Sequence, residues 1–143
     1  MTLKSTHLLK GKQVAEKMLN QDAFSKLLGI EIISISENCS QLSLIVNETM
    51  VNGFGIAHGA ITYALADTAL AFASNSSGTK SVSIETQISH ISKVLKGDNL
   101  IANASLIKEN GTLGWYTVEI INQNKKIVAH FKGTVFKSKN IWE

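Results

Sequence analysis

A histidine, a glycine and an aspartate with the potential for acyl chemistry lie in one apolar stretch, residues 52–73, which reads NGFGIAHGAITYALADTALAFA. His58 and Gly59 stand near the start of a predicted helix, and Asp67 stands near its middle. The helix is rich in alanine, has no proline and is apolar on nearly every face, which is typical of a helix surrounded by other structure. A buried carboxylate must be paired, hydrogen-bonded or functional. We therefore interpret Asp67 as a candidate nucleophile or general base, with a carboxylate capped by strand hydroxyls as the alternative.

The start of this helix is suited to a developing negative charge. The first N–H groups of a helix have no partner inside it, and the helix dipole favours negative charge there. Glycine also lets a substrate carbonyl group approach closely, so the amide of Gly59 is a candidate oxyanion donor. Asn52 offers a side-chain amide that can hold a water molecule, and His58 is expected to be neutral and to orient the loop. For Asn52 and His58, a purely structural role is the alternative.

The spacing of Gly59 and Asp67 predicts a dimer. Eight residues of helix separate their positions by about 12 Å, so one carbonyl carbon cannot contact both groups of the same helix. Two antiparallel copies of the helix across a two-fold axis would bring Gly59 of one chain near Asp67 of the other. Such isologous dimers are the commonest symmetric assembly. The sequence therefore predicts at least a homodimer, with two active sites where the chains meet.

Six strands are predicted around this helix. Two β-branched runs, Ile30–Ser36 and Gln41–Asn47, are expected to form a hairpin, and Cys39 near its turn is interpreted as structural. A polar break at residues 74–79 follows the helix. Turn signals then separate four further predicted strands: Ser81–Ser92, Asn99–Lys108, Leu113–Asn122 and Lys126–Lys137.

The order of these elements predicts one α+β domain over residues 1–143, with residues 1–10 as a loose tail. Residues 12–28 have the apolar spacing of a cover helix, with Asp22 as the N-cap of a second short turn and Gly29 as the C-cap. An antiparallel sheet needs cover on one face, and only the central helix is apolar enough to be embraced by the strands. The sequence thus predicts a curled sheet of about six antiparallel strands around one long helix, the hotdog arrangement.

Composition argues against several functions. The formal net charge is +3, and the lysines are scattered along the sequence, which contains no arginine. The bidentate contacts that arginine makes with bases and phosphates are therefore missing, and a nucleic-acid partner is not expected. Asp67 and the short apolar run argue against a membrane span. With one cysteine and no signal-peptide pattern, a cytoplasmic location is expected. No His/Cys cluster suggests a metal, and His7, His90 and His130 are interpreted as surface or sheet residues.

The stretch from Asn52 to Gly78 resembles the phenylacetate-pathway acyl-CoA thioesterases of the hotdog fold, the PaaI-like group. The resemblance rests on Asn52, on HGA at residues 58–60, on LADTA at 65–69 and on NSSG at 75–78. Three further segments also fit this family: residues 22–34, 97–100 and 118–133.

The resemblance implies hydrolysis of an acyl-CoA thioester to a free acid and CoA, with no cofactor, because coenzyme A is part of the substrate. It implies that Asp67 is the nucleophile or general base, and that Gly59 supplies the oxyanion N–H from the partner subunit. Asn52 and His58 would assist, and Ser83 would help to hold the water. The family forms tetramers from two such dimers, so a homotetramer is expected.

Two departures from the family pattern stand out. Ala60 replaces the second glycine of the HGG motif and narrows the space at the helix start. Ser92-Lys93 replaces an Arg-Pro pair near the expected CoA phosphates, where Lys93 or Lys96 would act as a point charge. Asn75, in the NSSG motif, is the remaining predicted substrate contact.

The sequence does not decide whether the accepted acyl group is an arylacetyl or a medium-chain group. A non-catalytic acyl-CoA sensor is the main alternative, and a hydratase is a weaker one.

Overall fold

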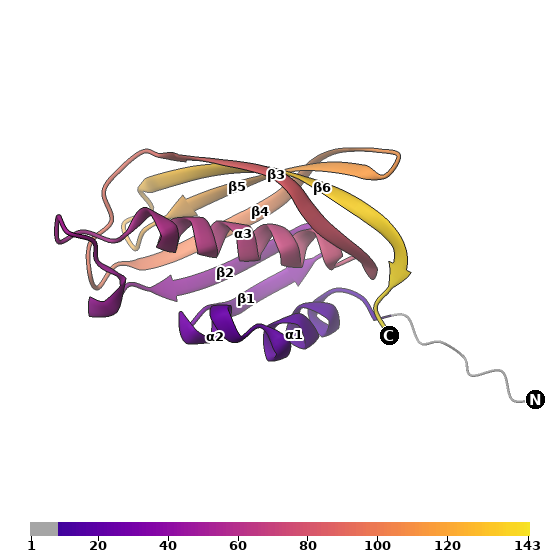
Figure 1. Cartoon of the computed structure of the whole chain (residues 1–143), viewed down its shortest axis with the longest axis horizontal. Helices are drawn as coiled ribbons and strands as arrows, with labels where there is room; N and C mark the ends of the chain where they lie inside the picture. Colours follow the sequence, from indigo (N-terminus) through magenta and orange to yellow (C-terminus); the bar gives the residue numbers. More distant parts are fainter. Residues whose placement is uncertain (1–8) are drawn as a thin grey trace, which may run out of the picture.

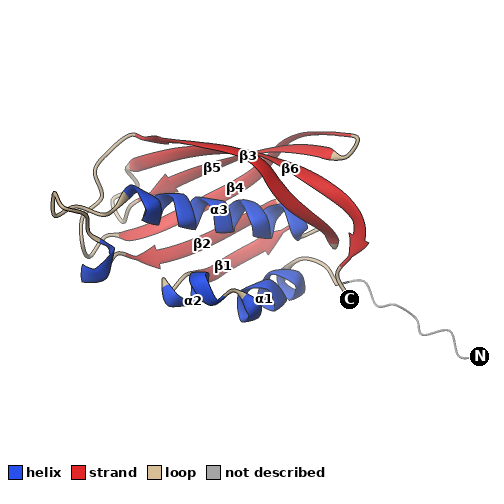
Figure 2. Cartoon of the chain, in the orientation of Figure 1, coloured by secondary structure: helices blue, strands red, loops and turns tan. Residues whose placement is uncertain are grey.

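Six antiparallel strands form one sheet in the order β1-β2-β4-β5-β6-β3 in the computed structural model, which describes residues 9–143. The sheet curls around helix α3, as Figures 1 and 2 show. Its strands are β1 (Glu31–Ser36), β2 (Cys39–Ile45), β3 (Thr79–His90), β4 (Asn99–Asn110), β5 (Leu113–Ile121) and β6 (Ile127–Ile141). The helices are α1 (Lys12–Gln21), α2 (Ala23–Leu27), the 3-10 turn η1 (Glu48–Met50) and α3 (Gly59–Asn75). This architecture confirms the predicted hotdog fold.

The core lies between α3 and the inner face of the sheet. Along β2 and β5, buried side chains alternate with more exposed ones, because successive side chains of a strand point to opposite faces. Leu65, Leu70 and Phe72 of α3 are almost fully buried in this core. Gly133 of β6 lets the helix come close, since a β-carbon there would lie 2.5 Å from Cδ2 of Leu70. These three large apolar side chains of α3 are thus buried in the core.

The N-terminal cover consists of two helices that pack beside β1 and α3 (Figure 1). The predicted break at Asp22 is confirmed: its carboxylate accepts a hydrogen bond from the backbone N–H of Ser25 at 2.9 Å and caps α2. Gly29, with a φ of 72°, follows the end of α2 as predicted. Most of the predicted tail, together with His7, lies outside the described residues.

Strand boundaries differ from the prediction at a few points. The β1–β2 turn contains only Glu37 and Asn38, since Ser36 pairs with Cys39. Asn38 has a φ of 58°, which asparagine tolerates better than most residues. At the other end of the chain, β6 continues to Ile141, beyond the predicted end at Lys137.

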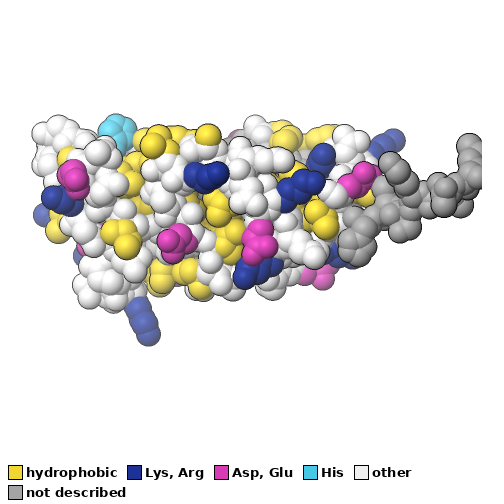
Figure 3. Space-filling view, turned by 90° about the horizontal axis from the view of Figure 1, so that it is seen from below, with side chains coloured by type: hydrophobic (Ala, Val, Ile, Leu, Met, Phe, Trp, Pro, Cys, Tyr) yellow, Lys and Arg dark blue, Asp and Glu magenta, His cyan; other side chains and the backbone are white. Residues whose placement is uncertain are grey.

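The surface on the side of α1 and α2 carries charges of both signs. Figure 3 shows lysine side chains scattered among Asp and Glu, with hydrophobic side chains between them. None of the described helices is long and apolar enough to cross a membrane.

One stripe of α3 is left uncovered, which differs from the prediction of a helix embraced on all sides. Ala60 is exposed, and Tyr63, Asp67 and Ala71 are half-buried. Residues spaced by three and four positions share one helix face, so these four side chains line a single stripe. The rest of the described chain does not fully cover this stripe. Asp67 lies in the gap.

Candidate active site

The first turn of α3 is capped by the side chain of the preceding histidine. His58 is the N-cap, and its Nδ1 accepts a hydrogen bond from the backbone N–H of Ala60 at 3.0 Å. An accepting nitrogen carries a lone pair, so the proton of the neutral ring sits on Nε2. Gly59 is the first residue of the helix, and its N–H finds no acceptor among the described residues. This N–H is therefore free to donate to a ligand.

Asn52 begins the loop that leads to this helix. Its Oδ1 accepts a hydrogen bond from the N–H of Phe54 at 2.9 Å, and its backbone N–H donates to the carbonyl oxygen of Ile56 at 2.8 Å. The side chain therefore does complete a turn, which is the structural role that the sequence left open. Among the described residues, its Nδ2 has no acceptor, which leaves the amide group able to donate to a ligand.

Asn52 and Gly59 line one cavity of about 360 Å³. The strand that follows α3 supplies an unexpected neighbour, because the ring of His90 covers the α-carbon of Gly59. A β-carbon on Gly59 would lie 3.1 Å from Nε2 of His90. The whole lining consists of Asn52, Ile56, Ala57, Gly59, Thr62, His90, Ile91, Ser92, Lys93 and Val94.

His90 is the residue that sequence reasoning missed. It does lie in the sheet, as expected, at the last position of β3, yet its side chain belongs to the Gly59 cavity. No local pattern links it to Gly59, which is 31 residues earlier in the chain. Of the two predicted lysines, Lys93 lines this cavity, whereas Lys96 is exposed and is not part of its lining.

Asp67 lines a second cavity of about 280 Å³ at the other end of the uncovered stripe. Ser83 of β3 borders the same cavity, so the structure brings these two predicted residues together. The carboxyl group of Asp67 accepts no hydrogen bond from a described residue, and the predicted alternative of strand hydroxyls that cap it is therefore not met. The cavity is lined by Met18, Asp67, Leu70, Ala71, Ser74, Ser81, Val82, Ser83 and Val135.

The acidity of Asp67 is altered by its surroundings. Burial, and to a smaller extent the negative charge of Asp22, raise the pKa of Asp67 above its ordinary value of 3.8. Both effects disfavour the charged form. Raised carboxyl pKa values in a cleft are typical of groups that exchange protons or attack substrates. Asp67 is thus an unpaired carboxyl group with altered acidity that faces a cavity.

Asn75 does not face either cavity, which corrects its assignment as a substrate contact. Asn75 is only 1% exposed. Its Oδ1 accepts hydrogen bonds from the N–H of Ser81 and from Nε1 of Trp142, both at 2.9 Å. Its Nδ2 donates to the carbonyl oxygens of Ala71 and Ser81. The amide is fully used in joining the end of α3 to β3 and to the C-terminal segment.

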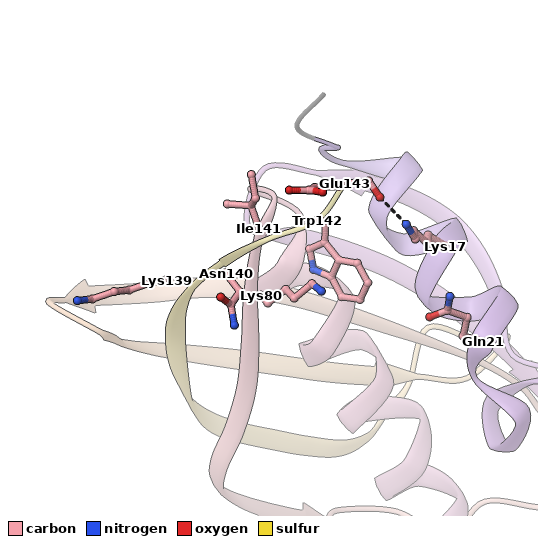
Figure 4. A pocket seen from close by; sticks show the side chains of 8 residues that line it. All are labelled: Lys17, Gln21, Lys80, Lys139, Asn140, Ile141, Trp142 and Glu143. Carbon is pink, nitrogen blue, oxygen red and sulfur yellow. Dashed lines mark hydrogen bonds between the residues drawn. The ribbon is translucent and has the colours of Figure 1, made fainter. Parts of the chain in front are cut away.

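A wider cavity of about 660 Å³ lies beside that segment (Figure 4). Lys80 holds its ammonium group 4.9 Å from the centre of the Trp142 ring, and Lys17 donates to the carbonyl oxygen of Glu143. In Figure 4, Lys139 points away from both. Its lining contains neither Asp67 nor Gly59, so this cavity is separate from the two that hold the candidate catalytic residues.

The candidate residues of one chain therefore lie in two separate cavities along α3. Gly59, Asn52 and His90 gather at its N-terminal end, while Asp67 and Ser83 face another cavity further along the helix. The predicted separation of donor and acid along the helix is retained.

Comparisons with known proteins agree with this fold and motif. Residues 54–129 match the thioesterase superfamily. The chain is 39% identical to the acyl-coenzyme A thioesterase PaaI of Escherichia coli K12 over 124 residues, which are 87% of this chain and 89% of the relative. The solved structure of the E. coli PaaI protein from the phenylacetic acid degradation operon is similar with a TM-score of 0.88 and 36% identity, over 90% of this chain and 94% of that one. For the phenylacetic acid degradation protein PaaI of Thermus thermophilus, the TM-score is 0.79 at 30% identity, over 82% and 100% of the two chains.

Proposed function

The chain belongs to the thioesterase superfamily, and we propose that it is an acyl-CoA thioesterase that hydrolyses an arylacetyl- or medium-chain acyl-CoA to the free acid and CoA. The observation that carries this proposal is the carboxyl group of Asp67, which is half-buried, accepts no hydrogen bond from a described residue and faces a cavity. The relatives named acyl-coenzyme A thioesterase support the reaction class. The PaaI relatives support the arylacetyl substrate.

The active form in this proposal is a dimer. Strand β3 ends the sheet, so one of its edges is unpaired, and Val82 and Ile84 on this strand are 63% and 59% exposed. A free, apolar strand edge without proline is a template for pairing with another chain. Antiparallel pairing of β3 with β3 of a second copy would also set the two α3 helices antiparallel. Two such dimers would form the proposed homotetramer.

This arrangement would bring the two groups of candidate residues together. Gly59 and Asn52 of one copy would meet Asp67 and Ser83 of the other, at each end of the paired helices. The N–H of Gly59 would donate to the thioester carbonyl oxygen, where negative charge develops. The carboxylate of Asp67 would approach the carbonyl carbon, either directly or through a water molecule that Ser83 helps to hold.

Coenzyme A is bound in this proposal as part of the substrate, without a further cofactor. Lys93 lies on the wall of the Gly59 cavity and would offer a point charge to a CoA phosphate, with Lys96 nearby in sequence. Among residues 9–143, no group of three or more His, Cys, Asp and Glu side chains is placed to hold a metal ion.

Release of free thiol tests the reaction. Purified protein is expected to release thiol from phenylacetyl-CoA or from a medium-chain acyl-CoA, and Asp67→Asn is expected to lower kcat by at least about 10²-fold. The exposed Glu119→Gln provides a matched carboxylate control. Full turnover in Asp67→Asn would contradict the role of the acid. If acyl-CoA raises the melting temperature and no thiol is released, the alternative of a non-catalytic sensor is correct instead.

The two routes for Asp67 differ in the fate of an oxygen atom. A nucleophilic carboxylate forms an anhydride with the acyl group, and its hydrolysis can leave an oxygen of water in Asp67. A general base only takes a proton. Single-turnover hydrolysis in H₂¹⁸O, followed by mass spectrometry of the peptide that contains Asp67, distinguishes the routes.

A further inference from the structure

The imidazole of His90 fills the space beside Gly59 that any other residue would need for its side chain. Its Nε2 and Cε1 atoms lie 3.1 and 3.3 Å from the position of a β-carbon on Gly59. The same ring lines the cavity that Asn52 and Gly59 share. A nitrogen of His90 therefore stands next to the candidate oxyanion donor.

The hydrogen bonds of Thr62 decide which nitrogen of His90 carries the proton. The hydroxyl group of Thr62 donates to the carbonyl oxygen of Gly59 at 3.0 Å, and this uses its only hydrogen. Its oxygen lies 3.3 Å from Nδ1 of His90, so it can only accept from that nitrogen. In the neutral ring, Nδ1 is then the donor, and Nε2, the nitrogen that lies next to Gly59, carries the lone pair.

A lone pair and an N–H group next to each other select different partners. The N–H of Gly59 suits a carbonyl oxygen, whereas Nε2 of His90 repels a carbonyl oxygen and can bind only a group that brings a hydrogen. The thioester carbonyl group and its sulfur atom carry no hydrogen, so the attacking water is the group at the reacting carbon that can donate to Nε2.

We propose that His90 is a catalytic residue that holds the attacking water. This inference rests on the proposed thioesterase function. Nε2 accepts one O–H of the water, while the Asp67 side of the site, contributed by a second copy, faces the other. With both hydrogens engaged, a lone pair of the water oxygen is directed at the carbonyl carbon that Gly59 polarises. With Asp67 as the general base, the C–O bond forms as a proton of the water passes to the carboxylate, and the C–S bond then breaks to release CoA. Thr62 acts as a positioning residue, since it keeps the ring oriented and its Nδ1 protonated.

Removal of the imidazole tests this role. His90→Ala is expected to lower kcat by about 10²-fold with little change in KM, because orientation of the water is lost and the thioester still binds. Free imidazole should restore much of the lost rate, since it can occupy the vacated space and accept the same hydrogen. His130→Ala is the matched control, because His130 is exposed on β6 and bonds to Thr117. Circular dichroism and the mass in solution check whether each variant keeps its fold and assembly.

A second pair of variants tests the positioning role of Thr62. Thr62→Val removes the oxygen that accepts from Nδ1 and is expected to lower kcat, whereas Thr62→Ser keeps the hydroxyl group and is expected to retain the rate. An equal loss in both would assign the effect to packing, because Thr62 is buried.

The outcomes separate this inference from the proposed function. Turnover by the unaltered protein, a loss in His90→Ala and recovery with imidazole would support a water-holding His90. Full turnover in His90→Ala, or a loss that imidazole does not reverse, would overturn the role of His90 and leave the thioesterase function standing. If the unaltered protein releases no thiol from any acyl-CoA, both the function and this inference fall.

Discussion

Asp22 and Asp67 lie close enough for the negative charge of Asp22 to add to the effect of burial in raising the pKa of Asp67. A chain of hydroxyl groups connects their helices. Ser25 donates to Oδ2 of Asp22 at 2.6 Å, and its Oγ lies 3.1 Å from the hydroxyl oxygen of Thr68, the residue after Asp67. The N-terminal helices therefore do more than cover the core, because they place a second carboxylate beside the candidate catalytic acid.

Asp22→Asn is predicted to lower the pKa of Asp67 without loss of the cap on α2. Asparagine caps helices about as well as aspartate, so the N–H of Ser25 keeps its acceptor, while the charge and the second acceptor, for the hydroxyl group of Ser25, are removed. With a lower pKa, Asp67 stays ionised at lower pH. The acid limb of the profile of kcat/KM against pH should therefore move to lower pH. The same profile for Asp98→Asn, a change in a loop near the other end of α3, should be unaltered. An acid limb that stays in place in Asp22→Asn would contradict the coupling.

Asp67→Asn is predicted to be more stable than the unaltered protein at neutral pH. The pKa of Asp67 is raised on folding, so the folded state holds its proton more tightly than the unfolded state. Stability from this group is present at low pH and is lost as pH rises from about the unfolded pKa of 3.8 through the folded value. Asparagine has no proton to lose, and the advantage of the variant should therefore vanish in acid. Urea unfolding at several pH values and one protein concentration measures this, and equal slopes with pH would contradict it.

Gly59→Ala is predicted to abolish most activity and leave the fold intact. The added methyl group would meet Nε2 of His90 at 3.1 Å, so the ring must move away from the helix start. Alanine favours a helix more than glycine does, and no loss of stability is expected. Gly53→Ala is the matched control, because a β-carbon there meets nothing within 4 Å. Thiol release and melting temperature together check the prediction, which fails if the two variants are equally active.

Charge on the free edge of the sheet is predicted to separate the chains. Val82→Lys with Ile84→Lys places two like charges on each β3, and their repulsion opposes pairing of two such strands. The double variant should elute as a smaller species and lose thiol release, since each active site needs both copies. Ile107→Lys alters an equally exposed residue of β4, away from the β3 edge, and should keep the original mass in solution. A double variant that keeps both its mass and its activity would exclude this interface.

Mixing two inactive variants is predicted to restore activity. In a dimer of Gly59→Ala with Asp67→Asn, one site is built from both altered residues and the other from both original ones. Random exchange at equal amounts makes half of the dimers mixed, each with one intact site, so about one quarter of the original activity should return. Prolonged co-incubation followed by a thiol assay measures this recovery. No recovery, with exchange of subunits verified by mass spectrometry, would place donor and acid of each site in a single chain.

The amino-acid sequence predicted the helices and strands better than it predicted the contacts of their side chains. The break at Asp22 and the start of the long helix at Gly59 are confirmed because each depends on a few neighbouring residues. Asn75 was misassigned because a motif does not reveal whether a polar side chain faces solvent or is used up inside the fold. His90 was overlooked because its role depends on contact with a residue 31 positions away.

The sequence by itself determined that a carboxylate and a helix-start glycine lie on one apolar helix about 12 Å apart, because helical spacing follows from the backbone alone. It also predicted the six strands and the long helix through local periodicity and capping. Only the tertiary structure decided that β3 ends the sheet with a free edge, that Asp22 raises the pKa of Asp67 and that the ring of His90 covers Gly59. Each of these depends on how distant segments pack, and packing is settled by the whole core at once.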